Sequence, residues 1–167
     1  ENFGDGIGNE ADELGNNALH RASNGAAKRT VKLCLARGID PNLYNGKGMT
    51  PLHLAMATSK ADRDQVAAYL MDHGSYIEAP DYDGNTPLHS ACECRVKDLL
   101  EIVQMLLAAD PQGVAARAKD RDGNLAVHSA CEKTGLPGHV QAGIVNALIE
   151  QNAEVTETDK VGGRLTP

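Results

Sequence analysis

The chain has 167 residues, of which 41% are hydrophobic and 23% are charged, a balance that favours one globular domain over a disordered segment. Its net charge is −7 at pH 7 and only 3% of its residues are aromatic, so a basic, aromatic nucleic-acid-binding surface is not expected. The most apolar run, Leu99 to Ala109, contains Glu101 and Gln104 and is too short to span a membrane, and no secretory signal pattern stands at the start.

The first part of the chain is acidic and rich in glycine. Residues 1–15 carry five acids and no base, which gives this stretch a charge of −5, whereas the rest of the chain is nearly neutral. We predict a solvated arm over residues 1–11, and an acidic docking tail is the alternative. A core of this size needs no disulfides, so the four cysteines favour a reducing compartment, cytoplasmic or nuclear.

After the arm, one short motif recurs four times. Each copy ends in a histidine and is followed two residues later by an alanine, and the histidines are 33, 36 and 39 residues apart. The four copies are Asn17-Ala18-Leu19-His20, Thr50-Pro51-Leu52-His53, Thr86-Pro87-Leu88-His89 and Leu125-Ala126-Val127-His128. A period of this length is typical of proteins built from stacked repeats.

A turn signal precedes every copy. The frame is Asx-x-x-Gly, beginning at Asp12, Asn45, Asp81 and Asp120, and it predicts a tight hairpin because Asp-Gly and Asn-Gly accommodate positive φ. A fifth frame begins at Asp159 and leads into Arg164-Leu165-Thr166-Pro167. We expect residues 159–167 to be either the start of a truncated repeat or an imperfect cap.

Each motif also reads as the start of a short helix that is followed by a second, more apolar helix. Thr50 and Thr86 suit the N-cap position and the prolines after them suit the first helical turn. The predicted second helices are Thr30 to Ala36, Gln65 to Met71, Leu100 to Ala108 and Ile144 to Ile149. Gly38 and Gly74 fit the left-handed residue that ends a helix; Asn152 can do the same, and Pro111 stops the third helix.

These features resemble ankyrin repeats, whose signature contains Thr-Pro-Leu-His-x-Ala at a period near 33 residues. The resemblance implies an all-α solenoid of helix-turn-helix units with β-hairpin loops, over residues 12–163 and divided at about 12–44, 45–80, 81–119 and 120–158. The longer repeats place extra residues between their helices at Thr58 to Asp64, Arg95 to Leu99 and Lys133 to Gln141, with another insertion around Pro111-Gln112-Gly113. These insertions are either neutral or specific binding features.

The recurring histidines invite a metal or catalytic interpretation, which the resemblance opposes. In ankyrin repeats this histidine is structural and bonds the backbone and the neighbouring threonine. Equivalent side chains in adjacent repeats lie about 10 Å apart, so His89-x-x-Cys92 and His128-x-x-Cys131 cannot close one zinc tetrahedron. We expect Cys92 and Cys131 to occupy small buried positions and Cys94 to point outward.

No catalytic arrangement stands out. Ser90 and Ser129 follow histidines directly, but adjacent helical residues point apart, so a Ser-His-acid relay is not expected. Tyr44 and Tyr82 are too few for a convincing methyl-lysine cage. We predict no enzyme activity and no cofactor or metal.

The resemblance places binding on the hairpin tips and the exposed side of the first helices. The candidate partner-binding residues are Arg21, Lys47, Met49, Leu54, Tyr82, Asp83, Asn85, Ser90, Glu93, Arg121, Asp122, Asn124, Glu132 and Lys133. The expected function is non-catalytic recognition of a protein or peptide by a monomer. The alternatives are an adaptor or substrate-recruiting segment of a larger enzyme or secreted effector, and a structural spacer that binds nothing.

Overall fold

A computed structural model describes residues 10–94, 98–132 and 137–151 of the chain. These residues form nine helices and no regular strand. The helices are α1 (Ala18–Asn24), α2 (Lys28–Ala36), α3 (Pro51–Ala57), α4 (Arg63–Asp72), α5 (Pro87–Glu93), α6 (Leu99–Ala108), α7 (Val114–Arg117), α8 (Ala126–Glu132) and α9 (Gly138–Glu150).

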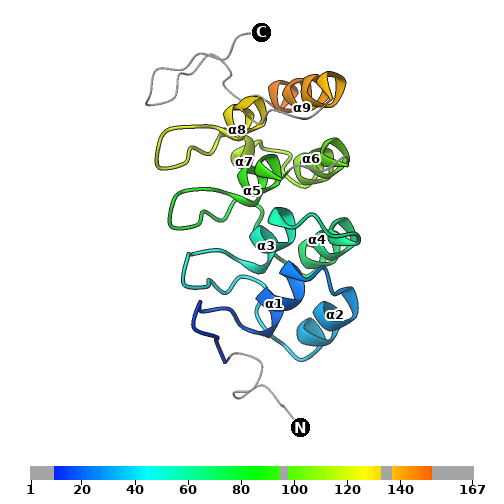
Figure 1. Cartoon of the computed structure of the whole chain (residues 1–167), viewed down its shortest axis with the longest axis vertical. Helices are drawn as coiled ribbons and strands as arrows, with labels where there is room; N and C mark the ends of the chain where they lie inside the picture. The colour runs from blue at the N-terminus through cyan, green and yellow to red at the C-terminus, as the bar shows by residue number, and fades with distance from the viewer. Residues whose placement is uncertain (1–9, 95–97, 133–136, 152–167) are drawn as a thin grey trace.

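The helices form two columns that run along the molecule (Figure 1). The short first helices α1, α3, α5 and α8 stand in one column, and each contacts the next. The second helices α2, α4, α6 and α9 stand in the other column, and each packs on the first helix before it. The loops that precede the first helices all project to the same side of the stack, so their tips form a row.

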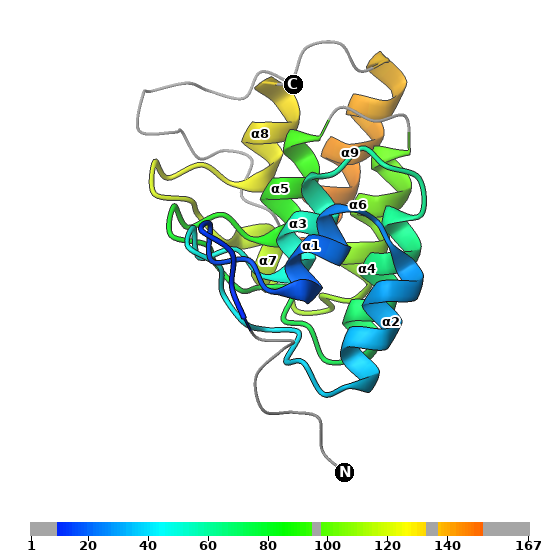
Figure 2. The same cartoon turned by 60° about the horizontal axis from the view of Figure 1, so that its bottom comes forward.

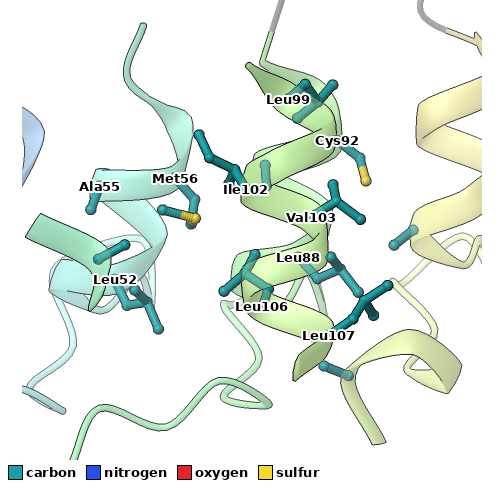
Figure 3. Close-up of a cluster of buried hydrophobic side chains, with 14 of the residues drawn as sticks. Leu52, Ala55, Met56, Leu88, Cys92, Leu99, Ile102, Val103, Leu106 and Leu107 are labelled. Carbon is teal, nitrogen blue, oxygen red and sulfur yellow. The ribbon is translucent and has the colours of Figure 1, made fainter. Parts of the chain in front are cut away.

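The core lies between the two columns and continues from one helix pair to the next. The leucine or valine before each motif histidine is at most 1% exposed, and so are Ile102 and Val103 on α6. Figure 3 shows the middle of this core, where Met56 of α3 and Leu88 of α5 lie with the apolar side of α6. Because the sequence contains no tryptophan, small aliphatic side chains fill this core.

The motif begins its helix as predicted. Pro51 and Pro87 occupy the first turn of α3 and α5, and Thr50 and Thr86 stand at their N-caps in extended backbone. At the other end of the helix pairs, Gly38 and Gly74 adopt φ of +80° and +83°, the left-handed conformation that ends α2 and α4. Asn152 and the frame at residues 159–167 lie outside the described residues.

The second helices begin earlier than the sequence predicted. α2 starts at Lys28 instead of Thr30, α4 at Arg63 instead of Gln65, and α9 at Gly138 instead of Ile144. The prediction was wrong because it followed the apolar residues, whereas the polar first turns are helical too. Arg63, Leu99 and residues 138–141, which had been assigned to insertions, therefore belong to helices.

The region after α6 contains a helical turn that the sequence did not predict. Asp110 is 5% exposed, and its carboxylate accepts the backbone N–H groups of Val114 at 2.9 Å and Ala115 at 2.8 Å. These bonds satisfy the free donors at the start of α7, in the manner of an N-cap. The insertion around Pro111 is thus ordered by a buried carboxylate.

Candidate protein-binding surface

The motif histidines join consecutive repeats. The Thr50 backbone N–H donates to Nδ1 of His53 at 3.0 Å, and Thr50 Oγ1 lies 2.8 Å from the same nitrogen. Nε2 of His53 lies 2.9 Å from the Asn85 carbonyl oxygen in the next repeat. The carbonyl can only accept, so Nε2 carries the proton and the neutral ring satisfies both contacts. His53 therefore holds its own helix start and the next hairpin together.

The contact with the next repeat recurs at His20 and His89, and the contact with the helix start recurs at His128. Nε2 lies 3.0 Å from the Met49 carbonyl for His20 and 3.3 Å from the Asn124 carbonyl for His89. At His128 the Leu125 backbone N–H donates to Nδ1 at 2.9 Å, although Leu125 has no side-chain acceptor for a cap. Burial in the apolar core lowers the pKa of His20, His53 and His89. These rings are structural joints rather than exposed acids or bases.

The hairpin loops before the first helices share one pattern of side-chain to backbone hydrogen bonds. Oδ1 of Asp81 accepts the backbone N–H groups of Asp83 at 2.9 Å and of Asn85 at 2.8 Å. Asp12, Asn45 and Asp120 each accept the two corresponding N–H groups of their own loops. The Asx residue of each frame therefore closes its turn, which explains why the sequence repeats it.

Backbone hydrogen bonds connect neighbouring hairpin tips. The N–H groups of Gly46, Tyr82 and Arg121 donate to the carbonyl oxygens of Leu14 at 3.0 Å, Lys47 at 3.1 Å and Asp83 at 2.7 Å respectively. Each of these bonds crosses from one loop to the next. Together they hold the four tips in register, in the row of loops that Figure 1 shows.

Side chains add to this connection in the middle of the row. The ring of Tyr82 lies against the backbone of Gly48, where an added Cβ would meet Tyr82 Cδ1 at 2.4 Å. The guanidinium of Arg121 donates to the Tyr82 carbonyl at 2.8 Å and pairs with Asp83 at 3.0 Å. Tyr82 nevertheless remains 65% exposed. One face of the Tyr82 ring therefore packs against Gly48, and the other face is exposed.

Most of the predicted binding residues reach the surface. Arg21, Lys47, Tyr82, Asp83, Glu93, Arg121, Asp122 and Glu132 are exposed, and Met49, Leu54, Asn85 and Asn124 are partly buried. Ser90 is only 6% exposed, so its hydroxyl is not available to a partner, and we remove it from the set. Lys133 lies outside the described residues. Arg21 also lies 3.4 Å from Asp12 in its own repeat.

The structure adds Leu14 to this surface. Leu14 stands at the tip of the first hairpin and is 61% exposed, although the sequence analysis did not select it. Its position in the Asx-x-x-Gly frame is that of Lys47, Asp83 and Asp122, so alignment of the frames was sufficient to find it. We call Leu14 and the predicted residues other than Ser90 and Lys133 the tip surface.

Cys34, Cys92 and Cys94 are buried, whereas Cys131, for which a buried position was also expected, is only partly buried. Burial is the main cause that raises the pKa of Cys92 to about 12, with smaller effects of Glu93 and Cys131, so its thiol stays protonated. The prediction that Cys94 points outward was wrong, since Cys94 is 8% exposed and its Sγ lies 3.6 Å from the Ala57 carbonyl. In the described part of the chain, no group of three or more His, Cys, Asp or Glu side chains is arranged to hold a metal ion.

A comparison with protein families agrees with this geometry. A family model described as ankyrin repeats, in three copies, matches residues 19–114 and 78–159, which is most of the chain. The chain belongs to the ankyrin repeat family. Ankyrin repeats are protein–protein interaction modules. The fold, the hydrogen bonds between the hairpin tips and the family therefore all indicate binding to another protein.

Several curated proteins are similar to parts of the chain. An intracellular phospholipase A2 of Caenorhabditis elegans is 38% identical over 62% of this chain, and the human transient receptor potential cation channel subfamily A member 1 is 33% identical over 56%. NF-kappa-B inhibitor alpha of Gallus gallus is 42% identical over 31%. The matches cover 10%, 8% and 15% of these relatives respectively. None of the helices among the described residues is long and apolar enough to cross a membrane.

Proposed function

We propose that this ankyrin repeat segment is a non-catalytic module that binds another protein or peptide through the tip surface. The backbone bonds between the tips support the proposal, because they fix the relative positions of the side chains before a partner arrives. A preorganised surface loses little conformational freedom on binding, so more of the contact energy contributes to affinity.

The central observation is the position of Tyr82. Exposed aromatic side chains with restricted motion are common anchors of protein interfaces. Tyr82 stands in the middle of the row and is held by Gly48 on one side, and the partly buried Met49 follows Gly48 directly in the sequence. We therefore assign Tyr82 and Met49 to the apolar centre of the interface, with Arg21 and Arg121 as polar contacts at either side.

The test is affinity capture with mass spectrometry, comparing the natural chain with a Tyr82→Ala, Met49→Ala double variant. The double variant should lose the specific partner while its helical circular dichroism is kept. Tyr76→Ala is the matched control, because Tyr76 is also an exposed tyrosine, at 58%, but lies outside the tip surface. Undiminished capture by the double variant, or equal loss with the control, contradicts the proposal.

A second candidate is that the segment recruits partners or substrates for a larger protein, either an enzyme or a secreted effector. The similarity to part of an intracellular phospholipase A2 favours this candidate, because that enzyme carries the matched region as a tenth of its length.

We also propose that the segment is monomeric and binds no nucleic acid. It works in a reducing compartment, cytoplasmic or nuclear, since the thiols are largely buried and unpaired.

A further inference from the structure

We propose a second interaction surface on the outward face of α2, which docks an acidic protein segment that carries an apolar side chain. The surface consists of Arg29, Thr30, Lys32, Leu33 and Ala36, all of which are exposed. Residues 29, 32, 33 and 36 share one side of a helix because they are three, four and seven positions apart. We call this set the α2 surface; none of its residues belongs to the tip surface.

The α2 surface lies at one end of the stack. Figure 2 brings this end forward and shows α1 and α2 with no described helix in front of them. Leu33 is 53% exposed, whereas Tyr69, Met105 and Ala147, at the same place in the other second helices, are partly buried against the core. An apolar side chain that later repeats bury is therefore left at the surface in the first repeat.

The sequence of α2 is adapted to this exposure. Cys34, Leu70, Leu106 and Leu148 are the equivalent core residues of the second helices, and the residue four positions before each one lies one turn earlier on the same side of its helix. That residue is Val66 in α4, Ile102 in α6 and Ile144 in α9, at most 1% exposed, but it is Thr30 in α2. Threonine at this position fits a face that meets water or a polar partner rather than another repeat of the same kind.

The charge of α2 opposes that of the chain. Residues 25–39 carry Lys28, Arg29, Lys32 and Arg37 and no acid, although the whole chain has a net charge of −7. The first turns of α4 and α6 contain Asp64 and Glu101, acids that the helix dipole favours there, whereas the first turn of α2 has none. Lys28 and Arg29 stand at the positive end of their helix, so helix stability does not account for them.

Neutral groups hold two of these bases in place. Nζ of Lys28 donates to Oε1 of Gln65 at 2.6 Å, and the ammonium group of Lys32 lies 5.1 Å from the centre of the Tyr69 ring. Neither contact removes positive charge, and within the described ranges no carboxylate pairs with Lys28, Arg29 or Lys32. Lys28 and Lys32 keep their charge in these contacts, and together with the exposed Arg29 they place positive charge beside an exposed leucine.

This combination selects the chemistry of the occupant. Carboxylates of a partner complement the bases, and an apolar side chain between them covers Leu33 and Ala36. A phosphate backbone would match only the charge and would leave Leu33 exposed. The charge complementarity and the central leucine therefore favour an acidic peptide segment over a nucleic acid.

The test measures fluorescence polarisation with the whole chain and a labelled peptide of about twelve residues, in which leucines alternate with runs of glutamate and aspartate. The natural chain should bind, and raising NaCl from about 50 to about 300 mM should weaken binding. Arg29→Glu with Lys32→Glu should weaken binding at least tenfold, and Leu33→Ser at least threefold. Lys60→Glu with Lys119→Glu makes the same change in net charge at exposed positions outside both surfaces and should leave binding within twofold.

Four results overturn the proposal. The first is no binding by the natural chain, and the second is equal loss in both charge-reversal variants. The third is a single-stranded DNA probe that binds more tightly than the peptide and is insensitive to Leu33→Ser. The fourth is evidence for an occupant from the chain itself. At least tenfold tighter binding after Glu1→Gln, Asp5→Asn and Glu10→Gln identifies the chain's own acidic arm as the occupant. Self-association that the α2 variant abolishes identifies a second copy.

The experiment also separates the two surfaces. The Tyr82→Ala, Met49→Ala variant leaves α2 intact and should bind the acidic peptide as the natural chain does. Loss of capture through the tips and loss of peptide binding through α2 are therefore independent results. Helical circular dichroism of every variant confirms that folding is kept.

Discussion

At the residue scale, two glycines with similar backbone conformations have different surroundings. Gly38 and Gly48 have φ of +80° and +74°, in the left-handed region where a Cβ atom is disfavoured. A Cβ on Gly38 would have no atom within 4 Å, whereas a Cβ on Gly48 would collide with the backbone and ring of Tyr82. Gly48 is thus required both for its turn and for the close approach of the next tip.

Alanine at the two glycines should therefore have unequal effects. Gly38→Ala should lower the free energy of unfolding by about 1 kcal/mol, since only the backbone conformation is strained. Gly48→Ala adds an overpacking cost from the displaced Tyr82 ring, so the loss should be about 3 kcal/mol. Urea denaturation measures both values, and equal losses would show that Tyr82 is not held against Gly48.

At the element scale, the first helices depend on contacts outside themselves. Helices α1, α3, α5 and α8 have seven residues each, and isolated helices of this length are unstable in water. In α3 and α5 the threonine cap, the proline and the buried histidine fix the first turn. In α8 Leu125 replaces the threonine, and it is 1% exposed, so added burial accompanies the loss of a side-chain cap.

The buried histidines make stability depend on pH. The pKa of His53 is lower in the folded chain than in the unfolded chain because burial disfavours the charged ring, so below about pH 6.5 the unfolded state binds more protons. The free energy of unfolding should be independent of this group above about pH 6.5 and should decrease as the pH falls further. His53→Gln should reduce that slope by at most about 1.4 kcal/mol per pH unit in chemical denaturation. If the free energy of unfolding kept the same slope against pH in the variant, His53 would bind a proton equally well in the folded and unfolded chains.

At the scale of the whole molecule, stability passes from repeat to repeat. The buried residues form one continuous cluster from Leu19 to Leu148, and the motif histidines bond across the same boundaries. In such stacks each repeat contacts only its neighbours, so a change in a central repeat affects both sides.

Leu88→Ala in the central repeat tests this coupling. Leu88 is 1% exposed, and its truncation should lower the free energy of unfolding by about 2–5 kcal/mol. Hydrogen exchange should become faster in α3 and α6 as well as in α5, because these helices share the core shown in Figure 3. Leu33→Ala is the control, since it removes the same atoms from an exposed site. An unchanged unfolding midpoint, or faster exchange confined to α5, would contradict the coupling.

The sequence was sufficient wherever a local rule decides the structure. The Asx-x-x-Gly frames, the Thr-Pro helix starts and the glycines after α2 and α4 each depend on a few neighbouring residues. The frame followed by the motif histidine recurs four times, and this recurrence identified the stack and its tips. The starts of the second helices were less predictable, because polar first residues such as Arg63, Asp64 and Gln65 of α4 carry no apolar signal.

Only the tertiary structure decided which side chains remain available. Ser90 is 6% exposed, and Cys94 is buried with its Sγ beside the carbonyl of Ala57, 37 residues earlier in the chain. Leu33 is 53% exposed, whereas its equivalents Tyr69, Met105 and Ala147 are partly buried against the core, and no described helix precedes the pair formed by α1 and α2. Repetition in the sequence specifies the unit, but burial depends on the neighbours that each unit has.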